Sequence, residues 1–278
     1  MTLIRVAHSP DSDDAFMFYA LAERLIDTGE LEFEHVLRDI ETLNQAAFEG
    51  RYEITAVSIH AYAYLDEGYA LLSSGASMGE GYGPLVVARR PLDEVELAGV
   101  EVAVPGALTS AALALRLWNP ALRTVVRPFD EIVPAVVAGE LAAGVVIHEG
   151  QLTWRDEGLH ALVDLGAWWG EQTGGLPLPL GGNVVRRDLG DEMVRRLARL
   201  LRQAVEYALA NREAALDHSL RYARGLDRAT ADRFVGMYVN QRTVDYGERG
   251  REAVRLFLDR AHRAGLIPRV PRLDFVAG

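Results

Sequence analysis

The sequence predicts an α/β protein in which two lobes flank a central cleft and are joined by two crossing strands. Short apolar stretches alternate with segments of helical spacing over roughly the first 150 residues, which is typical of βαβ units and a largely parallel sheet. Two similar strings, LVVARRPL from residue 85 and NVVRRDL from residue 183, stand about 100 residues apart. We interpret them as the strands that cross between the lobes. After the second string the pattern is almost wholly helical.

The first lobe is expected to comprise residues 1–90 and 187–278. Its predicted strands cover residues 3–7, 31–37 and 54–57. Each is followed by a predicted helix, the first two over residues 15–25 and 40–49 and the third, rich in aromatic residues, through residues 62–65. The polar turn SPDSDD at residues 9–14 is rich in residues that cap helix N-termini. Further helices are expected over residues 188–211, 214–222, 229–239 and 251–264. The first of these is amphipathic, with an apolar face formed by Met193, Leu197, Leu200 and Ala204.

The second lobe is expected to comprise residues 91–186. Its predicted strands cover residues 100–104, 124–126 and 141–147, and its helices begin near residue 111 and cover residues 132–138. The C-terminal helices are expected to return to the first lobe. A cleft between two such lobes is a preferred place for a small ligand.

Composition excludes several classes of function. The formal net charge is -11, whereas a broad nucleic-acid surface needs a basic patch. All basic residues are arginine, so lysine Schiff-base chemistry is excluded and the lysine of a phosphate-binding P-loop is missing. No G-x-G-x-x-G motif opens a helix. We therefore expect no nucleic-acid partner and no cofactor.

Hydropathy and cysteine content indicate the compartment. Mean hydropathy is near zero and no run of 18 apolar residues occurs, so no membrane association is expected. The first residues already alternate between apolar and polar side chains, as in a β-strand, and do not show the pattern of a secretory signal. It has no cysteine, which excludes disulfides and thiolate chemistry. These features favour a cytoplasmic protein, while the oligomeric state stays open.

The candidate catalytic residue is His148. It follows the apolar stretch LAAGVVI, which predicts a buried strand, and a carboxylate, Glu149, comes next. In open α/β sheets ligands bind beyond the carboxyl ends of the strands. The pKa of an imidazole suits a general base near neutral pH. The alternative is a histidine in an ordinary surface turn, and Glu149 either tunes it or faces solvent.

Hydroxyl groups follow three other predicted strands. Ser9 and Ser58 end strands of the first lobe, and Thr109 with Ser110 stands at a helix N-terminus of the second. Such a terminus binds anions through free backbone N–H groups, although simple capping explains one of these hydroxyls equally well. Asn44, inside the helix over residues 40–49, is a further candidate contact or a plain surface asparagine.

Other kinds of site are not supported. The seven histidines show no metal-ligand spacing, and there is no H-E-x-x-H motif, so no metal is expected. No G-x-S-x-G elbow accompanies a serine, which makes a hydrolase triad a weak alternative. Trp168 and Trp169 either line a pocket for a flat substrate or pack in the core.

Several motifs together resemble one enzyme family. They are SP with DAF at residues 9–10 and 14–16, DIETLN at 39–44, GPLVV at 83–87, PG at 105–106, IHE at 147–149, DLGAWW at 164–169 and LPLPLG at 176–181. This set is similar to the 1,4-dihydroxy-6-naphthoate synthases of the futalosine route to menaquinone. The resemblance runs through nearly the whole chain.

The resemblance implies a two-lobed fold of the type II periplasmic-binding-protein kind and a carbon–carbon lyase in the cytoplasm. Its small anionic substrate would be cyclic de-hypoxanthine futalosine, cleaved to 1,4-dihydroxy-6-naphthoate and a sugar-derived fragment. By analogy His148 is the proton acceptor. The implied substrate contacts are Ala56, Val57, Ser58, Thr109 and Ser110, to which we add Ser9 and Asn44.

The sequence departs from that family pattern at three places. The family tends to have asparagine at Asp13, threonine at Ser110 and serine at Gly150. Two alternatives stay open: a chorismate dehydratase of the same pathway, whose chemistry would not depend on His148, and a non-catalytic protein that binds small anions.

Overall fold

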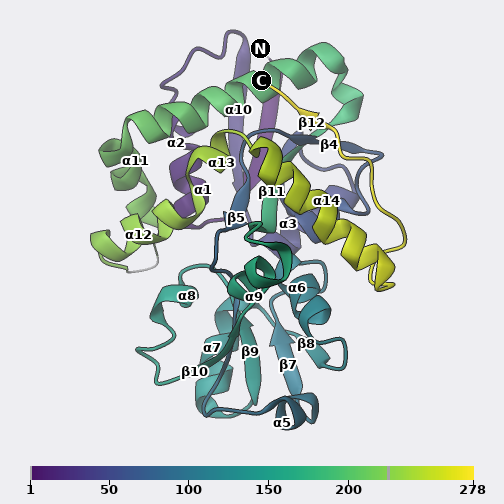
Figure 1. Ribbon diagram of the computed structural model, residues 1–278. Helices are drawn as coiled ribbons and strands as arrows, with labels where there is room; N and C mark the ends of the chain where they lie inside the picture. Colours follow the sequence, from purple (N-terminus) through teal and green to yellow (C-terminus); the bar gives the residue numbers. More distant parts are fainter. Residues whose placement is uncertain (1, 224–225) are drawn as a thin grey trace.

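The computed structural model describes residues 2–223 and 226–278, which fold around two β-sheets (Figure 1). The larger sheet contains β1 (Thr2–His8), β2 (Leu31–Leu37), β3 (Ile54–Ser58), β4 (Tyr69–Leu72), β5 (Ser77–Gly79), β11 (Leu178–Arg186) and β12 (Phe275–Val276). The strand order is β12-β4-β11-β3-β1-β2, with β5 beside β11. We call this sheet and its covering helices the large lobe.

The smaller sheet contains β6 (Leu85–Ala88), β7 (Glu101–Val104), β8 (Arg123–Val126), β9 (Ala143–Val146) and β10 (His160–Asp164), in the order β10-β6-β9-β7-β8. The helices of this small lobe are α5 (Glu94–Ala98), α6 (Ser110–Trp118), α7 (Phe129–Ala138), α8 (Gly150–Thr153) and α9 (Leu165–Thr173). Both sheets are thus mixed: in each, one antiparallel crossing strand, β11 or β6, lies between strands that run parallel to one another.

The large lobe carries the remaining helices. They are α1 (Ser12–Met17), α2 (Tyr19–Ala22), α3 (Ile40–Phe48), α4 (Ile59–Tyr62), α10 (Asp191–Ala210), α11 (Arg212–Ser219), α12 (Arg228–Tyr238), α13 (Gln241–Val244) and α14 (Gly247–Arg263). The C-terminal helices lie against this lobe (Figure 1). None of the described helices is both long enough and apolar enough to span a membrane.

The predicted helix over residues 15–25 is wrong in its bounds. It begins earlier, at Ser12, and is interrupted at Phe18, which ends α1 and precedes α2. The break lays the ring of Phe18 flat against His8, with ring centroids 4.5 Å apart. The sequence pattern also missed β4, β5, β10 and β12, which have two to five residues each and are too short to show a clear period.

The two crossing strands each belong to one sheet. β6 pairs with β9 and β10 in the small lobe, whereas β11 pairs with β3, β4 and β5 in the large lobe. The chain therefore passes between the lobes just before each crossing strand. The expected boundaries after residues 90 and 186 follow these strands, so we propose boundaries within residues 80–84 and 174–177 instead.

One hydrophobic core extends through both lobes. Its buried members include Leu71 and Phe257 of the large lobe and Val102, Val145 and Trp169 of the small lobe. Trp169, on α9, meets Phe257, on α14, edge to face with ring centroids 5.4 Å apart. The lobes are therefore joined by apolar packing along the side where α6, α9 and α14 meet, which is the right-hand side of Figure 1.

Candidate active site

A cavity of about 750 Å³, partly open to solvent, lies between the lobes. Its walls include every site residue that the sequence analysis singled out except Asn44: Ser9, Ala56, Val57, Ser58, Thr109, Ser110 and His148. These residues end or follow β1, β3, β7 and β9, so the carboxyl ends of strands from both sheets meet at one place. This is where ligands bind in open α/β folds.

His148 stands two residues after the end of β9 in a left-handed conformation, with φ of +54°. Few residues other than glycine adopt this region, and it costs on the order of 1–3 kcal/mol unless surrounding contacts hold it. Here Nδ1 of His148 lies 2.9 Å from Oδ2 of Asp11. The ring also meets Phe129 edge to face, with centroids 5.0 Å apart. These contacts fix the direction of the imidazole.

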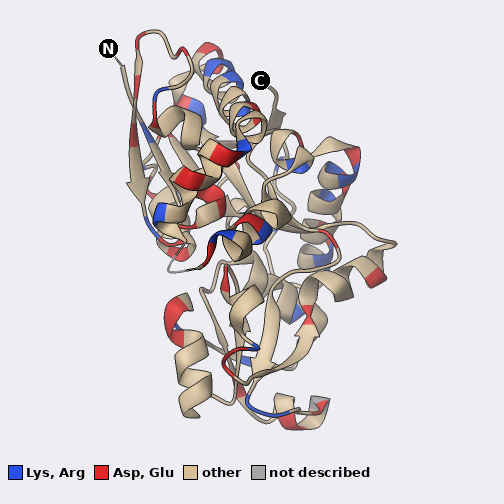
Figure 2. Cartoon of the chain, turned by 90° about the vertical axis from the view of Figure 1, so that its left-hand side faces the viewer, with Lys and Arg blue, Asp and Glu red and all other residues tan. Residues whose placement is uncertain are grey.

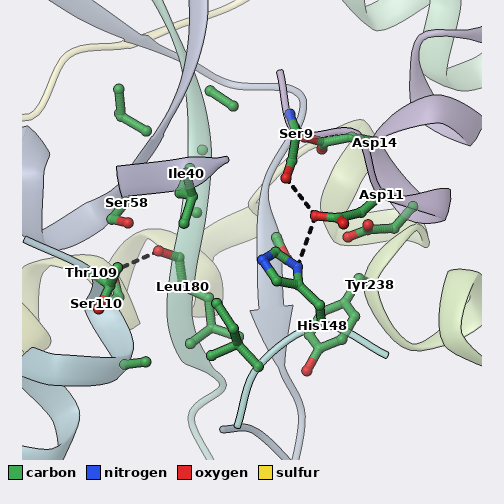
Figure 3. A pocket seen from close by; sticks show the side chains of 18 of the residues that line it. Ser9, Asp11, Asp14, Ile40, Ser58, Thr109, Ser110, His148, Leu180 and Tyr238 are labelled. Atoms are coloured by element: carbon green, nitrogen blue, oxygen red, sulfur yellow. Dashed lines mark hydrogen bonds and ion pairs between the residues drawn. The ribbon is translucent and has the colours of Figure 1, made fainter. Parts of the chain in front are cut away.

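The carboxylate of Asp11 is the main functional group that the sequence analysis did not identify. Asp11 precedes α1 and is completely buried. The hydroxyl of Ser9 donates a hydrogen bond to the same Oδ2 atom that contacts His148 (Figure 3). The polar turn at residues 9–14 was the sequence feature that could have indicated Asp11, but several of its residues could equally have capped the helix that follows.

Three further carboxylates surround this pair. Burial, reinforced by the charges of Asp14 and Asp11, raises the pKa of Asp13 well above its usual range. Burial also raises the pKa of Asp14 to about 7, although the N–H of Ser9 donates to its Oδ2 at 2.7 Å and opposes the shift. Glu149 is buried and accepts from the hydroxyl of Ser12 at 3.4 Å. Glu149 therefore does not face solvent.

These carboxylates decide the protonation of His148. Burial by itself would lower the pKa of the imidazole, but the charge and hydrogen bond of Asp11, followed by the charges of Glu149 and Asp13, raise it to about 9. The other ring nitrogen, Nε2, is buried and has no hydrogen-bond partner among the described residues. In Figure 3 it points away from Asp11, toward the side of the cavity where Ser58 lies.

Asn44 lies behind Ser58 and is not part of the cavity wall. It is completely buried, which excludes the surface asparagine that the sequence left open. Its Nδ2 donates to the Ser58 hydroxyl at 3.1 Å, and its Oδ1 accepts from the Ser58 N–H at 2.8 Å. Asn44 therefore orients Ser58, and any contribution to binding acts through that serine.

The hydroxyls of Thr109 and Ser110 are already used within the protein. Thr109 caps α6 by accepting from the N–H of Ala112 at 3.2 Å, and it donates to the Gly106 carbonyl at 2.9 Å. Ser110 donates to the Leu180 carbonyl at 2.6 Å (Figure 3). Near Thr109 and Ser110 a ligand can therefore bind to the positive end of α6 and to its first backbone N–H groups.

The tryptophan pair belongs to the core. Trp169 is completely buried, and its indole N–H donates to the Pro177 carbonyl at 3.0 Å. Trp168 packs against the same core. Neither is a member of the cavity wall. In the described part of the chain, no group of three histidine, cysteine or acidic side chains is arranged to hold a metal ion.

The fold is that of a two-lobed, periplasmic-binding-protein-like molecule. Two solved structures share it: a ligand-binding component of an import system from Staphylococcus aureus, with a TM-score of 0.73, and an alkanesulfonate-binding protein from Xanthomonas axonopodis, with a TM-score of 0.71. The first covers 99% of this chain and 96% of its own, and the second covers 98% and 96%. At 12% and 13% identity they show the fold alone.

Closer relatives show the family. A family model described as menaquinone biosynthesis matches residues 4–263. A 1,4-dihydroxy-6-naphtoate synthase of Thermus thermophilus is 44% identical over 99% of this chain and 100% of its own length. Another, from Streptomyces coelicolor, is 39% identical over 95% of both. A solved protein of Archaeoglobus fulgidus is 48% identical, with a TM-score of 0.91 over 95% of this chain and 98% of its own. The chain belongs to this family of menaquinone-biosynthesis enzymes, the 1,4-dihydroxy-6-naphthoate synthases.

Proposed function

We propose that the protein cleaves cyclic de-hypoxanthine futalosine to 1,4-dihydroxy-6-naphthoate, with His148 as the general base. The supporting observation is the ion pair between His148 and Asp11 on the cavity wall, in a chain whose relatives carry this synthase name. An imidazole held by a carboxylate at Nδ1 presents the lone pair of Nε2 to a ligand. We also propose that the enzyme works in the cytoplasm.

The cavity is polarised in a way that suits a substrate with one anionic end. Ser58, Thr109 and Ser110 lie on one side, while Ser9, Asp11 and Asp14 lie on the other (Figure 3). A substrate carboxylate placed beside the acidic side would be repelled. The N-terminus of α6 attracts it instead, through its backbone N–H groups and partial positive charge.

The apolar wall suits a flat ring system between these two ends. Ile40, Ile147, Pro84 and Leu180 line the cavity. In Figure 3, Ile40 and Leu180 lie between Ser58 with Thr109 on one side and Asp11 on the other. In the proposed reaction, neutral Nε2 of His148 removes a proton from the bound substrate. Carbon–carbon cleavage follows, and formation of the aromatic hydroquinone supplies much of the driving force. General base catalysis of this kind contributes about 10²- to 10⁴-fold in rate.

The identity of the reaction is tested by incubating the purified protein separately with cyclic de-hypoxanthine futalosine and with chorismate. We expect mass spectrometry to show 1,4-dihydroxy-6-naphthoate from the first and no dehydration of the second. Dehydration of chorismate instead would identify the pathway's chorismate dehydratase activity. Turnover of neither compound, together with binding of small anions, would favour a non-catalytic binding protein.

The role of His148 is tested with His148→Asn, which keeps a polar amide close to the position of Nδ1 but has no basic nitrogen. We expect kcat to fall at least about 100-fold while binding of 1,4-dihydroxy-6-naphthoate persists. Turnover near the rate of the parent enzyme would make His148 a structural residue.

The pH dependence follows from the raised pKa of about 9. At pH 7 only about 1% of such an imidazole is neutral and able to accept a proton. The kcat/KM of the parent enzyme should therefore increase about tenfold per pH unit and level off near pH 9. A profile that is highest at pH 6 would instead indicate an imidazolium that acts as an acid.

A further inference from the structure

The segment that carries His148 contacts the large lobe three times in succession. His148 meets Asp11 at 2.9 Å, Glu149 accepts from Ser12 at 3.4 Å, and Gln151 accepts from the hydroxyl of Tyr238 at 2.7 Å. In each pair one residue follows β9 of the small lobe and the other belongs to the large lobe. All three contacts cross the cleft, and all are polar.

The position of the Asp11 carboxylate is fixed by its surroundings. Its side chain is completely buried, and the Ser9 hydroxyl donates to the oxygen that contacts His148. A carboxylate fixed in this way accepts the Nδ1–H of the imidazole and excludes the opposite tautomer. The lone pair then stays on Nε2, the nitrogen that points away from Asp11 (Figure 3). Without Asp11 either nitrogen could carry the proton.

We propose that Asp11 is the positioning residue of His148: reaching across the cleft from the large lobe, it selects the tautomer and direction of the imidazole, so that a competent base exists only when the lobes are together. This inference rests on the proposed function, because it concerns the base of that reaction. It also accounts for the left-handed backbone at His148, which aims the ring at a carboxylate from the other lobe.

Several charged groups face His148, and an experiment has to distinguish the effect of Asp11 from the effects of the others. Asp11, Asp13 and Asp14 approach from the turn before α1 and from its first residues, and Glu149 is the neighbour in sequence. Of these, Asp11 is hydrogen-bonded to the ring. Asp13→Asn is therefore the matched control for Asp11→Asn. Both changes are isosteric, both remove one carboxylate from the cavity wall, and only Asp11→Asn removes the charge that contacts Nδ1.

The experiment combines kinetics with nitrogen NMR of protein labelled with ¹⁵N-histidine. The His148 signals are assigned by their loss in His148→Asn. In the parent protein we expect the Nδ1–H tautomer at high pH. In Asp11→Asn we expect a mixed or reversed tautomer, a kcat lowered about 100-fold or more, and a KM changed much less. The acidic limb of kcat/KM should move from near pH 9 toward the ordinary histidine value of about 6.5, and Asp13→Asn should move it less.

Two further results complete the test. Asp11→Glu keeps the charge but alters the reach, so it should retain much of the raised pKa while losing rate. An Nε2–H tautomer in the parent protein, or equal pH shifts in Asp11→Asn and Asp13→Asn, would overturn the positioning role. If His148→Asn turned over normally while NMR showed the expected tautomer, the positioning would stand and the proposed base would fail.

Discussion

At the scale of single residues, buried carboxylates serve different purposes in this molecule. Asp11 contacts His148 on the cavity wall. Asp66, just after α4, binds the C-terminal segment instead. Both Asp66 oxygens accept from Arg269, at 2.8 and 2.6 Å, and one also accepts from the N–H of Arg272 at 2.6 Å. Burial would raise the pKa of Asp66, but Arg269 and the Arg272 N–H outweigh it and hold the pKa below the usual range.

Replacement of this carboxylate should destabilise the protein without affecting the site. We expect Asp66→Asn to reduce the free energy of unfolding by about 1.5–3 kcal/mol at pH 7, the range for hydrogen bonds to a charged group. Because the folded pKa is lowered, the stabilisation is fully present above about pH 4 and is lost as pH falls through the folded value. Urea unfolding at pH 7 and at about pH 3 checks both points. A difference that persists unchanged at pH 3 would contradict the ionic origin.

At the scale of elements, α6 shows a residue that serves stability and binding together. Thr109 caps the helix whose N-terminus we propose as the anion contact. Thr109→Ala should reduce stability by about 1 kcal/mol, the usual cost of a lost cap, whereas Thr109→Ser keeps the hydroxyl and should reduce it much less. Thermal unfolding and KM are measured for both variants. If KM increased strongly in Thr109→Ala at unchanged stability, the hydroxyl would bind substrate directly.

The limits of sequence reasoning are clearest at the ends of the strands. Ser9, Ser58 and His148 could be expected near one another because parallel strands end at a common edge, and they line one cavity. The pairing of His148 with Asp11 could not be predicted, since it depends on how two lobes bring together residues 137 positions apart and on a left-handed backbone at a non-glycine residue. Asn44 was a candidate substrate contact, yet both ends of its amide form hydrogen bonds with Ser58.

Some of the shortest strands were also missed by the sequence pattern. β5 covers three residues and β12 covers two, so neither shows a period of its own. Both are held by tertiary pairing: β5 with β11, and β12 with β4. Long periodic elements were easier to locate. α10, for example, places Leu197, Leu201 and Ala204 in the core along a helix of 20 residues.

At the scale of the whole molecule, the two sides of the cleft differ in chemistry. Along α6, α9 and α14 the lobes share an apolar core that includes Trp169 and Phe257. Near α8 they meet through polar pairs, among them Tyr238 with Gln151. Acidic and basic residues occur along elements of both lobes (Figure 2). Since polar pairs exchange with water at small net cost, the α8 side is suited to open, while the apolar side is suited to act as the hinge.

Opening should therefore respond to the polar contacts of the α8 side. Tyr238→Phe removes the hydroxyl that donates to Gln151 across the cleft. One neutral hydrogen bond contributes about 1 kcal/mol, which shifts the equilibrium about fivefold toward the open form. Small-angle X-ray scattering should show a larger radius of gyration for ligand-free Tyr238→Phe than for the parent protein, and 1,4-dihydroxy-6-naphthoate should reduce it. Tyr207→Phe, on α10, is the control. Equal radii for all three proteins, with and without ligand, would rule out opening at this side and leave access to His148 to a local movement of residues 147–151.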